Sequence, residues 1–306
     1  PDVIAASARF VRLRADIKAP PHIRASLGFD HDSVKRRFQE VRTTDESTIW
    51  ASLSSRFLDK VDMTLKFAHG DRSDPAYEPV AAITPPENPL LLKYNMAGRL
   101  RDSAELRADI AATDRISIGL EADASEDEYS NSTVGLTTAK EYNFGGDVTM
   151  MLSERTNLHL FGNREVIESQ QAGSQAFSEA DWWGKNEDTI DLVGIGVRHE
   201  AIKDRLDIGA DYTVTRSTGE IDVNAPAGES GFPNLSTSLD SLKLYATYRL
   251  NNNVLLRAAY WYEDYESDNW MLDGVAPGTI PNVLAFGELS PRYHVHVIAV
   301  SARYVF

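Results

Sequence analysis

One pair of histidines near the C-terminus has the residue type and spacing of a metal site. His294 and His296 lie two positions apart, and therefore on one face of a strand, where two imidazoles can hold a metal ion. The same face would carry Ile298 and Val300. This surrounding favours instead two histidines at a membrane rim, directed to lipid headgroups, and we expect no metal site here.

Carboxylates near the C-terminus are a second candidate. Asp264, Asp268 and Asp273 offer the oxygen ligands that Ca²⁺ prefers, but their spacing matches no regular ligand loop, and a solvated acidic loop is the simpler interpretation. No Gly-x-Ser-x-Gly elbow or phosphate-binding glycine loop occurs. We therefore expect no catalytic residues and no enzyme, with a lipid hydrolase built from scattered Ser and His as one alternative.

The composition excludes cysteine chemistry and argues against nucleic acid binding. The 306 residues include no cysteine and carry a formal net charge of −15. Without cysteine there is no disulfide, no thiolate metal site and no motif for covalent haem attachment, so we expect no cofactor bound by this chain itself. The acidic balance argues against nucleic acid as a partner, because nucleic acid requires basic patches.

The elements that would position these residues are strands. In residues 142–152, Phe144 and Val148 alternate with Gly145 and Asp147; since side chains alternate across a strand, such a segment has one apolar and one polar face. About 13 segments follow this period: 6–17, 22–32, 46–57, 61–69, 100–112, 116–128, 140–152, 157–170, 187–200, 205–218, 237–249, 254–267 and 292–306.

The connections between the segments alternate in length. Short ones, such as 113–115 and 250–253, carry turn-forming residues, whereas long ones, such as 70–99 and 268–291, are rich in Gly, Pro, Ser and Asp. No run approaches the roughly 20 apolar residues of a membrane helix, but a membrane barrel escapes that test. A soluble sandwich has strands of about five or six residues and an apolar interior. We therefore predict an all-β, antiparallel transmembrane β-barrel in the bacterial outer membrane, with residues 1–306 as a single domain.

The polar faces of these strands would then line the lumen. They carry charges of both signs, which suit either a protein plug or a watery pore. The predicted lumen-facing residues include Arg107, Asp109, Glu121, Asp123, Asp147, Asp207, Asp211, Lys243, Arg249, Arg257 and Arg303.

The chain ends in the alternating strand HVIAVSARYVF. A terminal Phe306 with Tyr304 two positions before it is similar to the C-terminal signal for outer-membrane assembly, and the two rings would lie at the periplasmic aromatic girdle. The short turns are then periplasmic and the long loops extracellular. An odd strand count with an external N-terminus predicts that the first part of the barrel is missing.

The last loop and strand, residues 268–306, resemble the C-terminal signature of the MtrB/PioB family, the decahaem-associated outer-membrane barrels. The similarity is strongest over residues 90–306. The loop residues that carry it are Asn269, Trp270, Asp273, Gly274, Ile280, Pro281, Asn282 and Pro291.

The resemblance implies a mechanism. Such barrels have roughly twice this strand number and act as insulating sheaths, into which a periplasmic multihaem c-type cytochrome inserts to carry electrons across the outer membrane, in some cases to a surface-exposed multihaem cytochrome. Outer-membrane lipid is the other expected partner. The length of the chain, and the lack of the family's N-terminal Cys-x-x-Cys, fit the C-terminal half of a larger barrel. A porin passing small solutes remains the main alternative.

Overall fold

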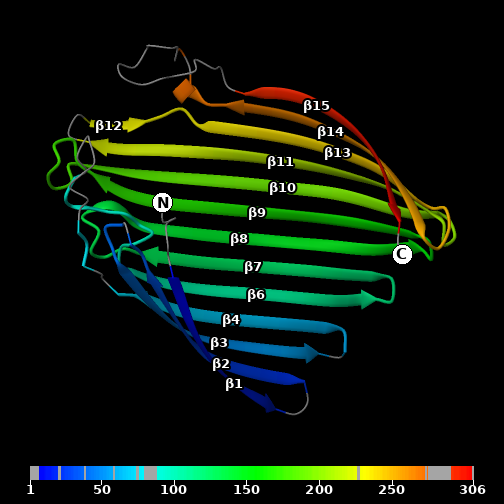
Figure 1. Cartoon of the computed structure of the whole chain (residues 1–306), viewed down its shortest axis with the longest axis horizontal. Helices are drawn as coiled ribbons and strands as arrows, with labels where there is room; N and C mark the ends of the chain where they lie inside the picture. Colours follow the sequence, from blue (N-terminus) through cyan, green and yellow to red (C-terminus); the bar gives the residue numbers. More distant parts are fainter. Residues whose placement is uncertain are drawn as a thin grey trace.

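The computed structural model describes residues 7–19, 22–37, 39–57, 59–73, 76–78, 88–225, 228–272, 274 and 291–304. Thirteen long strands pair with their neighbours in chain order, every pair antiparallel, and each predicted segment falls on one of them (Figure 1). The strands are β1 (Ser7–Ala19), β2 (Ile23–Lys35), β3 (Thr43–Phe57), β4 (Val61–Arg72), β6 (Arg99–Thr113), β7 (Ile116–Glu128), β8 (Val134–Ser153), β9 (Thr156–Gly173), β10 (Trp182–Ile202), β11 (Leu206–Ala225), β13 (Leu235–Arg249), β14 (Val254–Asp268) and β15 (Arg292–Tyr304).

Three short elements complete the described structure. β5 (Leu91–Leu92) pairs in parallel with β8, and β12 (Gly228–Gly231) pairs with β11. The 3₁₀ turn η1 (Trp270–Leu272) follows β14. Within the described ranges, no helix has the length and apolar character needed to cross a membrane. In those ranges β1 pairs with β2 alone and β15 with β14 alone, so the sheet is not closed.

One face of the sheet is apolar over its whole width. The register aligns Leu53, Leu65, Leu106, Ala122 and Phe144 as successive partners on β3, β4, β6, β7 and β8. This apolar face is exposed, because large side chains such as Ile298 and Val300 on β15 are each 79% accessible. A contiguous apolar surface of this extent requires an apolar surrounding phase.

The packed core of the described region lies at one end of the sheet. Its almost fully buried side chains come from the long connections and the adjoining strand ends: Val41, Met96, Ala97, Tyr129, Val134 and Ala172. We call this group the loop-end core. The described parts of three long connections, at Val41, Met96 and Tyr129, therefore fold back onto the sheet.

Four strands are longer than the sequence pattern predicts. β8, β9, β10 and β11 have 20, 18, 21 and 20 residues, and they include much of the predicted loops 129–139, 171–186 and 219–236. The apolar face of these strands changes to charged and polar residues at Arg164, Asp191 and Arg216. Backbone hydrogen bonds between β9, β10 and β11 continue beyond these residues, so strand pairing does not require an apolar face there.

Candidate functional site

The polar face of the sheet is the candidate functional surface. The register places all eleven predicted lumen residues on this face: Arg107 is opposite Glu121, for example, and Asp211 is opposite Lys243. Their alignment on one face is a finding, whereas their place in a lumen stays a prediction. The residues come from β6, β7, β8, β11, β13, β14 and β15, so the face extends across most of the sheet.

Ion pairs cover much of the polar face. Arg107 Nε lies 3.2 Å from Asp109 Oδ2, and Arg198 Nη2 lies 3.1 Å from Asp207 Oδ2. The arginine side chains of both pairs are well exposed, so water screens each pair and neither contributes much to stability. Such weakly held charges are available to hydrogen-bond another molecule.

Between β6 and β9 the polar face forms a hollow of about 280 Å³. Arg107, Asp109 and Glu121 border it, and His159 Nε2 lies 3.6 Å from Asp147 Oδ2 at its far side. The His159 ring also stacks on Phe161, with 5.1 Å between ring centroids. The hollow offers both hydrogen-bond donors and acceptors.

Several glycines on the polar face leave space that side chains of the neighbouring strands occupy. A Cβ atom built at Gly194 would lie 2.2 Å from the Phe161 ring, and one at Gly209 would lie 2.3 Å from the Tyr245 ring. At Gly145 the same atom would lie 2.6 Å from the Glu121 carboxylate. The side chains of the neighbouring strands therefore lie flat over the glycines, and the space above the sheet stays open.

A buried ion cluster connects the polar face to the loop-end core. Arg99 lies 2.7 Å from a Glu46 carboxylate oxygen and 3.2 Å from one of Asp127, and Arg101 Nε lies 2.7 Å from the second Asp127 oxygen. The Arg72 guanidinium donates to the carbonyls of Ala97 and Tyr94 at 2.7 and 2.6 Å. The cluster thus holds the connection before β6 against the strands. Sequence reasoning missed it.

Two groups of this end, both outside the strands, have shifted pKa values. Burial acts to raise the pKa of Glu40, but the ion pair and hydrogen bond with Lys93 and a backbone hydrogen bond outweigh it, so the pKa lies below its ordinary value. Burial, with the nearby charge of Asp127, raises the pKa of Tyr129. Both shifts indicate a closely packed environment.

The predicted C-terminal features are partly described. Tyr304 pairs with Val254 and is 58% exposed on the apolar face, at the end of the sheet with short turns; Phe306 lies outside the described residues. His294 Nδ1 lies 2.8 Å from Asp264 Oδ1, and His296 Nδ1 lies 2.9 Å from the Tyr260 hydroxyl. Both histidines therefore have partners on the apolar face, at its loop end.

The predicted loop motif is also partly described. Trp270 stacks on Phe232 with 4.8 Å between ring centroids, the Asn269 side chain accepts a hydrogen bond from the Met271 amide at 3.1 Å, and the Pro291 carbonyl accepts one from Ser267. Gly274 has a positive φ of 70°. The motif residues outside the described part are Asp273, Ile280, Pro281 and Asn282.

A solved outer-membrane transporter has a similar arrangement of strands. The chain superposes on the unliganded ferric citrate transporter FecA with a TM-score of 0.55 and 7% sequence identity, over 98% of this chain and 54% of that chain. At this identity the likeness concerns the fold alone, an outer-membrane type of β-sheet.

Sequence comparison shows the family. The chain is 30% identical over 300 residues to the outer membrane protein MtrB of Shewanella baltica (strain OS185), covering 97% of this chain and 43% of that relative, so it spans less than half of the relative's length. The family described as outer membrane beta-barrel porin, MtrB/PioB, matches residues 8–306. The chain therefore belongs to the MtrB/PioB family of outer-membrane β-barrels, and its place is the outer membrane.

Proposed function

We propose that this chain forms part of a barrel that encloses a multihaem c-type cytochrome and insulates its electron path across the outer membrane. The observation that carries the proposal is the family membership over residues 8–306. In this function the apolar face contacts lipid, the polar face contacts the cytochrome, and the haem belongs to the partner.

The polar face supports the proposal by its shape. Flat rings over Gly194 and Gly209 and the flat Glu121 carboxylate over Gly145 leave room for a folded partner next to the wall. Exposed pairs such as Arg107 with Asp109 supply charges of both signs for hydrogen bonds to that partner. The 306 residues contain no cysteine, so any c-type haem in the complex is attached outside these residues.

A porin for small solutes is the second candidate, because the matched family is described as a porin. The same polar face would line a water-filled channel. The two functions differ in what fills the interior, and this difference can be measured.

The test uses the full-length protein, purified in mild detergent from its native membrane. The sheath predicts a co-purifying haem protein, visible as a c-type Soret band and on a haem-stained gel, and little ion conductance in planar bilayers. A colourless barrel with steady single-channel conductance would contradict the sheath and support the porin.

A matched pair of variants locates the contact. Gly145→Leu places a bulky side chain on the polar face, where it displaces Glu121, whereas Gly146→Leu places the same side chain next to Leu120 on the apolar face. We expect Gly145→Leu to reduce the haem that co-purifies per barrel and Gly146→Leu to leave it unchanged. Equal haem content in the two variants would remove this face from the proposal.

A further inference from the structure

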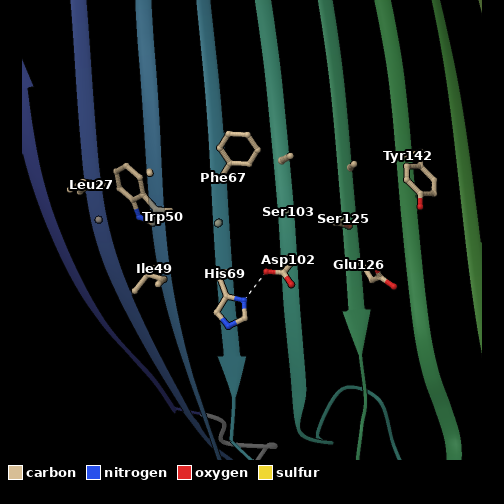
Figure 2. Close-up of a pocket in the computed structure, with 15 residues that line it drawn as sticks. Leu27, Ile49, Trp50, Phe67, His69, Asp102, Ser103, Ser125, Glu126 and Tyr142 are labelled. Atoms are coloured by element: carbon tan, nitrogen blue, oxygen red, sulfur yellow. Dashed lines mark hydrogen bonds and ion pairs between the residues drawn. The ribbon is translucent and has the colours of Figure 1, made fainter.

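A hollow on the apolar face has the form of a binding site. Its volume is about 690 Å³, and it extends over β2 to β8 at the loop end of the apolar band (Figure 2). The outward-facing apolar band of an outer-membrane barrel contacts lipid. The hollow lies at the end of the apolar band that is nearer the long connections, where the band gives way to charged residues.

The shape of the hollow follows from one row of cross-strand partners. Phe67, Ala104, Ala124 and Tyr142 are successive partners on β4, β6, β7 and β8. The two alanines form a low floor, and Figure 2 shows the Phe67 and Tyr142 rings on either side of it. The result is an apolar depression of a width set by two small side chains.

Polar groups form the loop-side edge of the depression. The next row of partners is His69, Asp102, Glu126 and Lys140. His69 Nδ1 lies 2.7 Å from Asp102 Oδ1, as Figure 2 shows, and Lys140 Nζ lies 2.7 Å from Glu126 Oε1. An apolar depression therefore ends directly at two acid–base pairs, which is the arrangement of a lipid, with its acyl chain and its headgroup.

We propose that this hollow binds one acyl chain of a membrane lipid whose headgroup carries both a phosphate and an amine. The chain lies on Ala104 and Ala124 between the two rings. His69 and Lys140 donate to the phosphate, and Asp102 and Glu126 accept from the amine. Charges of both signs in one row complement such a headgroup better than a purely anionic one. The proposal goes beyond the electron conduit and does not depend on it.

Shape and headgroup contacts must provide the preference for this site. The surrounding acyl chains are as apolar as the hollow, so there is no hydrophobic gain on binding. Dispersion contacts, which require close approach on several sides, favour the depression over the flat parts of the apolar face. A side chain that fills the floor should therefore abolish the preference.

The experiment uses the full-length protein in liposomes that contain phosphatidylethanolamine with a photoreactive diazirine in one acyl chain. After irradiation, mass spectrometry measures the lipid attached to peptides of β4, β6 and β7. We expect Ala124→Leu to lower this yield about fivefold or more, because the new side chain occupies the floor. Ala122→Leu, on the same strand and face but outside the hollow, is the matched control and should keep the yield.

Equal yields for the wild type and both variants, or an equal fall in both variants, would show general lipid contact and overturn the proposal. The headgroup is tested with the same probe made as phosphatidylglycerol, which lacks the amine. We expect a lower yield with this lipid, and a lower yield of the ethanolamine probe for His69→Ala. Identical yields for the two lipids would overturn the assignment of the headgroup.

Discussion

At the scale of residues, burial separates two kinds of charged side chain on the polar face. Arg99 has a side chain only 15% exposed and neutralises two carboxylates, of which Asp127 is 8% exposed. Arg107 pairs with Asp109 in the open, where its side chain is 70% exposed. Water screens the second pair and not the first, so the first has a structural role and the second is free for partners.

Replacing Arg99 tests this difference. Arg99→Ala leaves the Glu46 carboxylate without its ion partner, whereas Asp127 keeps Arg101, and we expect it to lower the local opening free energy by about 2–3 kcal/mol. Arg107→Ala, the control, should leave it nearly unchanged, because water screens the exposed pair. Hydrogen exchange of residues 93–101 and 125–129 measures both. Similar effects of the two substitutions would contradict the assignment.

Glu40 gives a pH dependence of known sign. Its pKa in the folded chain lies below the ordinary value, so its contribution to stability is complete above the pKa of the unfolded chain, about 4.3. The contribution is lost as the pH falls through the folded-state pKa. We expect the amides of residues 93–97 to lose protection on acidification below about pH 4, after correction for intrinsic exchange rates.

Glu40→Gln should weaken the same amides already at pH 7, by about 1–3 kcal/mol, because the hydrogen-bonded charge pair with Lys93 is removed. It should also flatten their dependence on pH. Glu154→Gln, in an exposed turn at the other end of the sheet, serves as the control. An unchanged pH profile in Glu40→Gln would assign the effect to another group.

At the scale of elements, each strand combines an apolar band with a polar face, and this division decides which substitutions are tolerated. The period of two was sufficient to predict all thirteen long strands, because lipid contact imposes apolar residues at alternate positions. It could not predict the outer parts of β8 to β11, where Thr138, Lys185 and Glu220 stand in place of apolar residues and the alternation carries no hydropathy signal.

The candidate site was predictable only in part for the same reason. Alternation predicts on which face Arg107 or Asp211 lies. It cannot predict that Arg99 meets Asp127, because their contact depends on the register between β6 and β7 and on the fold of a long connection. The hollow of the apolar face likewise requires Ala104 and Ala124 to be aligned across two strands.

A charge placed in the apolar band tests the division between the faces. Leu120, at the middle of the band on β7, is 50% exposed on the apolar face, and Glu121 follows it on the polar face. Leu120→Arg should destabilise the inserted barrel by about 2–4 kcal/mol, the cost of arginine near the bilayer midplane. Glu121→Arg should cost little. Denaturant unfolding in liposomes compares them, and equal stability would refute the placement.

The height of the band gives a further prediction. Gln170 and Leu160 lie on the same face of β9, on opposite sides of Arg164. In intact cells we expect a membrane-impermeant maleimide to label Gln170→Cys and to leave Leu160→Cys unlabelled, since this chain has no cysteine of its own. Labelling of both positions would mean that the band ends lower on β9.

At the scale of the whole molecule, the sheet has two strand edges. In the described ranges β1 and β15 each have one partner, and unpaired backbone groups cannot face hydrocarbon. Because the chain covers 43% of its MtrB relative, further strands are the expected partners of these edges. We expect residues 1–306 expressed alone to self-associate in detergent, and the full-length protein to be a monodisperse barrel. Light scattering after size-exclusion chromatography would show a lone monomer if this expectation is wrong.

The long strands β9, β10 and β11 have a consequence for access from outside the cell. Residues 164–173, 182–191 and 216–225 continue the sheet from the first charged residue of the apolar face onward, a length of about 30 Å along each strand at 3.3 Å per residue. In an outer-membrane barrel this part of the wall projects beyond the lipid. We therefore expect a large particle outside the cell to be held further from the lipid on the side of β9 to β11 than on the side of β1 to β4, whose strands are shorter.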